Sequence, residues 1–284
     1  MSTRSRHKRH SQHKHSSRKK QVHYLRRALA AAAVLILIAA AGYTLAFKPV
    51  WLPFEWPIKA SGESAEAARP EPPYTIAVDA GHGGADPGAV GVILERDMTA
   101  ATAQALIRLL ENDENFIPVE TRESYDSTAA PIERAEYANR QNPDLLLSIH
   151  GNSSPNSTEA SGFECYPVTP GRTWHTESLT FAQKLASEME AAGNSLRGQG
   201  GIRYLYYNEE NEKILAEANN TQIREEGTFT ILEEAECPAV LVEQCFVTNA
   251  DDVDRFGDAD GVERAAQAYY RAICNYFGVA PLEG

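Results

Sequence analysis

Two histidines and a glutamate stand where short apolar segments of the chain end. His82 follows the run YTIAVDAG, His150 directly follows DLLLSI, and Glu243 directly follows AVLV. Imidazole nitrogens and carboxylate oxygens are ligands of catalytic zinc, where three protein groups leave one coordination position for water. Of the eight histidines, five lie within residues 1–27, so two of the other three occupy such positions. These residues could form a hydrolytic metal site, with Glu243 facing the bound water as a base.

The third metal ligand could be any of several carboxylates near the first histidine. Glycines surround His82 in DAGHGGADPGAVG, so the backbone there can turn sharply and bring a substrate close. Spacing does not rank the nearby acidic residues, which are Asp79, Asp86, Glu95 and Asp97. A histidine in a glycine-rich turn is also often purely structural. Spacing alone therefore leaves both a metal site and a structural turn open.

Apolar periodicity predicts strands that alternate with helices around these residues. Short β-branched or continuous apolar runs are typical of strands, and apolar residues at helical spacing indicate helices. The predicted strands are residues 74–79, 116–121, 144–149, 162–166, 228–232 and 239–242. The predicted helices are residues 98–110, with Asp97 as N-cap, and residues 131–140, 176–192 and 261–277, while residues 201–207 are ambiguous.

This order of elements predicts a single α/β domain with a twisted, mostly parallel or mixed sheet flanked by helices. Ligands of such sheets bind beyond the carboxyl ends of the strands, where loops converge. We therefore expect His82, His150 and Glu243 to meet at one edge of the sheet. No internal repeat and no second proline-rich break divides residues 74–281, which we expect to form one domain.

The first 73 residues differ sharply in composition from the rest. Residues 1–27 carry ten of the 27 Lys and Arg residues and none of the 39 Asp and Glu residues. Residues 28–47 contain no charge, and a helix of that length spans about 30 Å of hydrocarbon, which predicts a transmembrane helix. Residues 48–73 hold six of the 15 prolines and are expected to form an extended linker.

The charge distribution also predicts an orientation in the membrane. Basic residues before the apolar segment place residues 1–27 in the cytoplasm as a tail on anionic lipid, and the domain outside the cell membrane on the wall side. A cleaved signal peptide is the alternative, but a basic region of 27 residues before the apolar run is unusually long for one. We expect no nucleic-acid partner for the acidic outer domain.

Four cysteines lie in the outer domain, at positions 165, 237, 245 and 274. Their scattered spacing matches no zinc-ribbon pattern, and four cysteines in a domain of this length are too few for a disulfide scaffold. We expect them to be buried free thiols.

In these motifs the chain resembles the zinc-dependent N-acetylmuramoyl-L-alanine amidases of bacterial cell walls, amidase type 3. The resemblance runs from about residue 75 to residue 277. Its motifs appear in order as DAGHGGADPGAVG, LERD, TR at 121–122, ERAEYAN, SIHGN and PAVLVEQCFVTNADD. The resemblance implies His82, Glu95 and His150 as zinc ligands and Glu243 as the catalytic residue, which selects Glu95 among the carboxylates that spacing leaves open.

The implied reaction is hydrolysis of the amide between the lactyl group of N-acetylmuramic acid and L-alanine of the peptidoglycan stem peptide. Two rival functions are a catalytically silent, membrane-tethered protein that binds peptidoglycan or regulates other enzymes, and a zinc peptidase that cuts within the stem peptide. One departure bears on activity, because Cys245 stands where the family usually has glycine. Its thiol could shift Glu243 or simply pack in the core.

Overall fold

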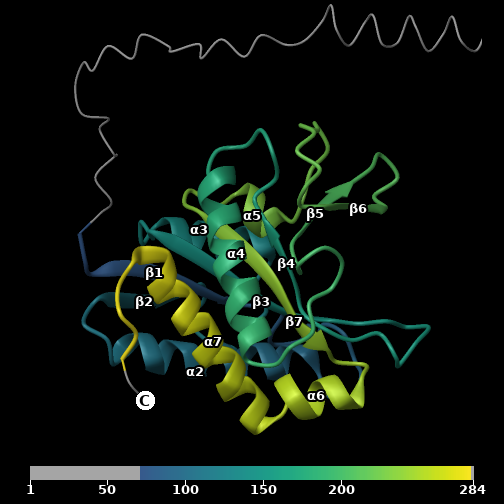
Figure 1. Ribbon diagram of the computed structural model, residues 1–284, viewed down its shortest axis with the longest axis horizontal. Helices are drawn as coiled ribbons and strands as arrows, with labels where there is room; N and C mark the ends of the chain where they lie inside the picture. Colours follow the sequence, from purple (N-terminus) through teal and green to yellow (C-terminus); the bar gives the residue numbers. More distant parts are fainter. Residues whose placement is uncertain (1–70, 283–284) are drawn as a thin grey trace, which may run out of the picture. The chain divides into compact units, whose positions relative to one another are not determined.

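The computed structural model describes residues 71–282, and five of its strands form one mixed sheet (Figure 1). The strand order is β2-β1-β3-β7-β4, in which β4 runs antiparallel to β7 and the other neighbours are parallel. The strands are β1 (Tyr74–Ala80), β2 (Phe116–Glu120), β3 (Leu145–Asn152), β4 (Glu164–Pro167) and β7 (Ala239–Phe246). The predicted α/β fold with a mixed sheet is confirmed.

Helices connect these strands and begin where local sequence favours a helix start. Pro131 occupies the first turn of α3, where its missing N–H costs nothing, and the side chain of Asp258 accepts a hydrogen bond from the N–H of Gly261 at the start of α7. The helices are α2 (Glu95–Glu111), α3 (Pro131–Asn139), α4 (His175–Ala191), α5 (Thr230–Glu233), α6 (Ala250–Phe256) and α7 (Ala259–Phe277).

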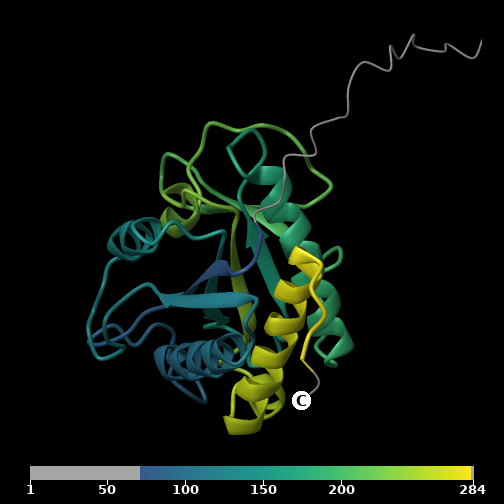
Figure 2. The ribbon, with the colours of Figure 1, turned by 90° about the vertical axis from the view of Figure 1, so that its left-hand side faces the viewer.

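Two hydrophobic cores cover the two faces of the sheet. Alternate residues of β3 point to opposite faces, so Leu145, Leu147 and Ile149 join the larger core with α2, α4 and α7. Leu146 joins the smaller core with α3 and α5. Figure 2 shows α4 and α7 on one side of the sheet and α3 on the other. His150 shares its face with Leu146 and therefore lies on the side of the smaller core.

The predicted strand at residues 228–232 is wrong, because Thr230–Glu233 form the short helix α5. A carboxylate oxygen of Glu233 accepts a hydrogen bond from the N–H of Thr228 at 3.0 Å, which bends the chain into a turn. Ile231 and Leu232 are both buried in the smaller core. An apolar run this short does not distinguish a strand from one helical turn.

The start of α2 also differs from the prediction. The helix begins at Glu95, and its N-cap is Leu94 rather than Asp97. The backbone N–H of Glu95 donates a hydrogen bond to the carbonyl of Ala89 at 3.0 Å. The helix therefore begins about one turn before the predicted start at residue 98. Asp97 instead pairs with Arg96 at the surface, at 3.2 Å.

A hairpin beside β4 settles the ambiguous residues 201–207. Arg203–Tyr207 form β5, which pairs with β6 (Lys213–Glu217) in a separate antiparallel sheet. Neither β6 nor α6 is predicted from the sequence, because both are short and mix apolar with charged residues. The four cysteines are free and buried, as expected.

The expectations for the first 70 residues lie outside the described part of the chain. They concern the basic tail at 1–27, the transmembrane helix at 28–47 and most of the linker at 48–73. Among residues 71–282, no helix is long and apolar enough to cross a membrane.

Candidate metal centre

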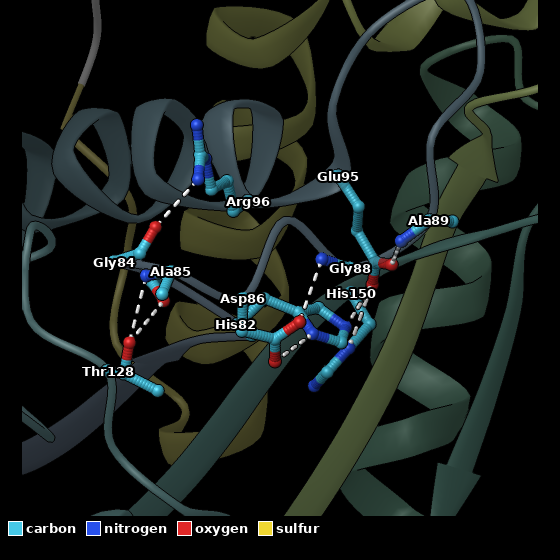
Figure 3. A network of polar contacts seen from close by, with 12 residues as sticks. His82, Gly84, Ala85, Asp86, Gly88, Ala89, Glu95, Arg96, Thr128 and His150 are labelled. Atoms are coloured by element: carbon cyan, nitrogen blue, oxygen red, sulfur yellow. Dashed lines mark hydrogen bonds and ion pairs between the residues drawn. The ribbon is translucent and has the colours of Figure 1, made fainter.

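His82, Glu95 and His150 come together at the carboxyl edge of the sheet. His82 lies in the loop after β1, Glu95 is the first residue of α2, and His150 lies on β3. One ligand atom from each lies within 4.8 Å of the others. Oε1 of Glu95 lies 3.1 Å from Nε2 of His82 and 2.9 Å from Nδ1 of His150, as Figure 3 shows. Among residues 71–282, these three residues are the only group of His, Cys, Asp or Glu side chains close enough together to hold a metal ion.

Glycines allow the three groups to approach this closely. A Cβ added to Gly81 would lie 2.4 Å from the ring of His150, and one added to Gly88 would lie 2.6 Å from both Glu95 and His82. Gly88 also has a φ of +63°, and His82 itself adopts the left-handed region at +64°. The imidazole of His82 is therefore held toward the carboxylate of Glu95 by a strained backbone conformation.

Two buried arginines fix the backbone of the loop that carries His82. Arg122 donates hydrogen bonds to the carbonyls of Ala80 and His82. Arg134 donates to the carbonyl of Ala80 at 3.3 Å. The backbone on both sides of the first histidine is thus fixed by charged donors rather than by loop packing alone.

Asp79 anchors this arginine pair and is not available as a metal ligand. Its carboxylate is fully buried and accepts from Arg134 at 2.5 Å, Thr121 at 2.5 Å and Ser148 at 2.7 Å. Burial alone would raise the pKa of Asp79, but the charge of Arg134 and the hydrogen bonds from Thr121 and Ser148 outweigh it and hold the pKa below its usual value. The group is ionised and structural.

Asp86 orients the first histidine instead of joining the group. Its Oδ2 lies 2.8 Å from Nδ1 of His82, which leaves Nε2 facing Glu95 (Figure 3). A carboxylate on the outer ring nitrogen fixes the tautomer and orientation of a metal-binding imidazole. Asp97 is exposed and bound to its neighbour, so of the four carboxylates left open by spacing, Glu95 is the one in the group.

Glu95 is held in place by the main chain as well as by the imidazoles. It is 4% exposed, and its two oxygens accept from the N–H of Gly151 at 3.0 Å and of Ala89 at 2.8 Å. Burial raises its pKa, but hydrogen bonds and charge from His150 and His82 reverse the shift and leave the pKa far below its ordinary value. The carboxylate is therefore charged at neutral pH.

Glu243 stands beside this group at the position that pairs with His150 across β3 and β7. Burial raises the pKa of Glu243, and the charges of Glu95 and Glu164 raise it further, to about 8. Its Oε2 is buried and has no hydrogen-bond partner among the described residues. A carboxylate oxygen left free beside three metal-type ligands is placed to exchange a proton with a reacting water.

Cys245 does not disturb this arrangement. Between the pairs His150 with Glu243 and Asn152 with Phe246, β7 contains one residue more than β3, which is a β-bulge. The bulge turns Cys245 into the larger core, where its Sγ lies 3.6 Å from Sδ of Met98. Its backbone is not in the left-handed region, so the position does not require glycine.

Glu164 and Arg122 are site residues that the sequence reasoning does not assign. Glu164 is the register partner of Glu243 on β4 and is 3% exposed. A charged residue inside the predicted strand 162–166 is the signal that could have singled it out. For Arg122, the signal is the TR motif at 121–122.

A groove of about 940 Å³ lies between the loop before α2 and the loop after β3, and none of the four residues of the centre lines it. Its walls are joined to the segment after β7, because the N–H of Val92 bonds to the carbonyl of Val247 at 2.7 Å and the N–H of Ser154 bonds to Oγ1 of Thr248 at 3.1 Å. Val90 and Val92 are 67% and 56% exposed, which gives the groove apolar as well as polar surface. The groove is lined by residues 90–92, 154–159 and Thr248.

The donor set fits a zinc-type metal ion. Two imidazoles and one ionised carboxylate match the ligands of catalytic zinc, and one imidazole already has the outer carboxylate that such sites use. Beside them, Glu243 contributes a buried carboxylate oxygen that has no hydrogen-bond partner among the described residues. Fold and site thus describe an α/β protein with a candidate metal centre at the carboxyl ends of its strands.

The chain belongs to the N-acetylmuramoyl-L-alanine amidase family, a family of cell-wall hydrolases. The profile of that family, Amidase_3, matches residues 76–275. The match runs from within β1 to within α7 and includes all four residues of the centre.

Individual relatives agree with the family. The chain is 31% identical over 216 residues to the uncharacterized protein YqiI of Bacillus subtilis, covering 75% of this chain and 89% of the relative. It is 29% identical over 204 residues to the N-acetylmuramoyl-L-alanine amidase LytC of Bacillus subtilis, covering 72% of this chain and 35% of LytC. The solved catalytic domain of CwlV, an amidase of Bacillus (Paenibacillus) polymyxa, superposes with a TM-score of 0.58 at 28% identity, covering 73% of this chain and 99% of that domain.

Proposed function

We propose that the protein hydrolyses the amide between N-acetylmuramic acid and L-alanine of the stem peptide in a zinc-dependent reaction. His82, Glu95 and His150 would hold the ion. The observation that carries this proposal is the convergence of these three residues, with ligand atoms within 4.8 Å of one another, beside the unpaired carboxylate oxygen of Glu243.

When bound, zinc supplies a Lewis acid that polarises the amide carbonyl and lowers the pKa of water from about 16 toward 7. Glu243 acts as the general base: its Oε2 takes a proton from the attacking water. The same oxygen then returns the proton to the nitrogen of the leaving L-alanine. A base with a pKa near the working pH is suited to both transfers, and burial raises the pKa of Glu243 above its ordinary value.

The surrounding residues keep this geometry fixed during the reaction. Asp86 holds the tautomer of His82, and Arg122 holds the carbonyl of the same residue. Preorganised groups of this kind cost no reorganisation when the transition state forms.

Digestion of purified peptidoglycan tests the proposal and separates its rivals. We expect new L-alanine amino termini and free lactyl carboxyl groups on muramic acid to appear together. New amino termini at other residues would indicate a peptidase within the stem peptide. Binding to the wall without new termini would indicate a catalytically silent protein.

We further propose that residues 28–47 anchor the protein in the cell membrane, with residues 1–27 in the cytoplasm and residues 74–281 on the wall side. The support is the uncharged run of 20 residues after the basic tail. Protease added to intact wall-less cells should remove the domain while leaving the tail protected. Recovery of the uncleaved chain in the soluble fraction would contradict the anchor.

A further inference from the structure

Three side chains from the β5–β6 hairpin and the loop before α5 form a small group that we call the Lys213 rim: Tyr207, Lys213 and Phe229. Tyr207 and Lys213 are partners in the antiparallel register of the hairpin. Nζ of Lys213 lies 5.8 Å from the centroid of the Phe229 ring, and the ring of Tyr207 meets that of Phe229 edge-on at 6.3 Å. The aromatic face steadies the ammonium group by a cation–π contact.

The Lys213 rim is linked to the candidate base through Tyr166 on β4. Phe229 packs edge-on against Tyr166 at 5.3 Å, and Tyr166 shares one face of β4 with Glu164, the register partner of Glu243. The electrostatics agree with this placement. Burial and the neighbouring carboxylates raise the pKa of Glu243, and the charge of Lys213 opposes them.

Lys213 is the cation near Glu243 that remains free for a ligand. Arg203 is already shared between Glu164 at 2.6 Å and Glu217 at 3.0 Å. Within residues 71–282, no carboxylate pairs with the ammonium of Lys213, and its side chain is exposed. An exposed ammonium without a carboxylate partner can form a charge-assisted hydrogen bond to an incoming anion.

The chemistry of the substrate supplies such an anion. The peptide on the leaving side of the scissile amide carries carboxylates, on its acidic side chain and at its C-terminus. A carboxylate that meets the ammonium of Lys213 forms a charge-assisted contact, which also limits the positions of the peptide on this side of the base.

We propose that Lys213, steadied by Phe229 and Tyr207, binds a carboxylate of the stem peptide and so selects substrates that carry one. This inference rests on the proposed amidase function. Lys213 is a specificity-determining residue in this account and takes no part in proton transfer.

The test compares synthetic N-acetylmuramoyl-L-alanyl peptides in which the side-chain carboxyl, the terminal carboxyl or neither is converted to the carboxamide. We expect the wild-type protein to cleave the fully carboxylated peptide with a kcat/KM about threefold to tenfold higher than that of one amidated form. The form that loses rate identifies which carboxylate is bound. The difference should lie mainly in KM and should shrink as salt is added.

In Lys213→Gln that preference should disappear, while the rate on the amidated peptide stays near the wild-type value. Lys213→Arg, which keeps the charge, should retain most of the preference. Lys184→Gln is the matched control, because Lys184 is the other lysine of the described domain and lies on α4, which packs on the opposite face of the sheet. It should behave as wild type.

Two results would overturn the inference: an unchanged preference in Lys213→Gln, or an equal loss on all peptides, which would show an effect through Glu243 or the fold. Both are distinct from failure of the proposed function, in which the wild-type protein would cleave none of the peptides.

Discussion

His150 and Glu243 occupy paired positions on the neighbouring parallel strands β3 and β7. Adjacent strands lie about 4.8 Å apart, and their main-chain hydrogen bonds fix the register. The candidate ligand and the candidate base are therefore placed side by side by the sheet itself, on the face that carries the smaller core. The bulge that follows ends this register just after the site and directs Cys245 into the larger core.

Replacing the base should separate catalysis from metal binding. In Glu243→Gln we expect turnover to fall about 10²-fold to 10⁴-fold, because the amide cannot accept the proton of the attacking water. Bound zinc should stay near the wild-type level, since the three proposed ligands are intact. Peptidoglycan hydrolysis and metal content of the same preparation check both points. Near-normal turnover would remove Glu243 from the mechanism.

Loss of either imidazole should have a different outcome. His82→Ala and His150→Ala are each expected to lose zinc and activity together, because two ligands do not form a tight site. His175→Ala is the matched control: this third histidine of the domain bonds to the carbonyl of Val168 at 2.8 Å, away from the centre. Full metal content in His82→Ala would contradict the ligand assignment.

The buried pair of Asp79 and Arg134 should make stability depend on pH. The folded-state pKa of Asp79 lies below its ordinary value of 3.8, so its contribution is complete above that value and is lost as pH falls through the folded-state pKa. In Asp79→Asn, which leaves Arg134 buried and unpaired, we expect a loss of about 3–5 kcal/mol at pH 7.

Urea unfolding of both proteins across pH 7 to 2.5 measures this difference. The gap between wild type and Asp79→Asn should narrow below about pH 4, where the Asp79 carboxylate of the unfolded wild-type chain begins to take up a proton. A gap that stays constant down to the lowest pH would show that the charge of Asp79 does not stabilise the fold.

Cys245 should matter for packing and not for catalysis. In Cys245→Ala, loss of the sulfur beside Met98 should lower the free energy of unfolding by about 1 kcal/mol, while kcat of the folded protein stays unchanged. Chemical denaturation and turnover at a temperature well below unfolding measure the two effects. A large change in kcat with unchanged stability would show that the thiol acts on Glu243.

Long apolar segments make most of the fold predictable from the sequence. The continuous run before His150 and the run before Glu243 are both strands of the central sheet, and the α/β pattern alone is enough to expect their carboxyl ends at one edge. The run at residues 228–232 is too short for this reasoning, and the local hydrogen bond between Glu233 and Thr228 decides its conformation.

The site is less predictable, because its contacts span long separations in the chain. Spacing leaves Asp79, Asp86, Glu95 and Asp97 equivalent, and only family resemblance favours Glu95. The structure shows why two of the others are not in the group: Asp79 is paired with Arg134, and Asp86 contacts Nδ1 of His82, the ring nitrogen that faces away from Glu95. Pairings of this kind depend on packing, which no local pattern encodes.

The most direct test of the central claim is the release of L-alanine amino termini from purified peptidoglycan, measured before metal chelation, after chelation and after zinc is returned. The account predicts one zinc ion per chain, loss of release on chelation and recovery with zinc. Undiminished release from protein that contains no zinc would contradict it.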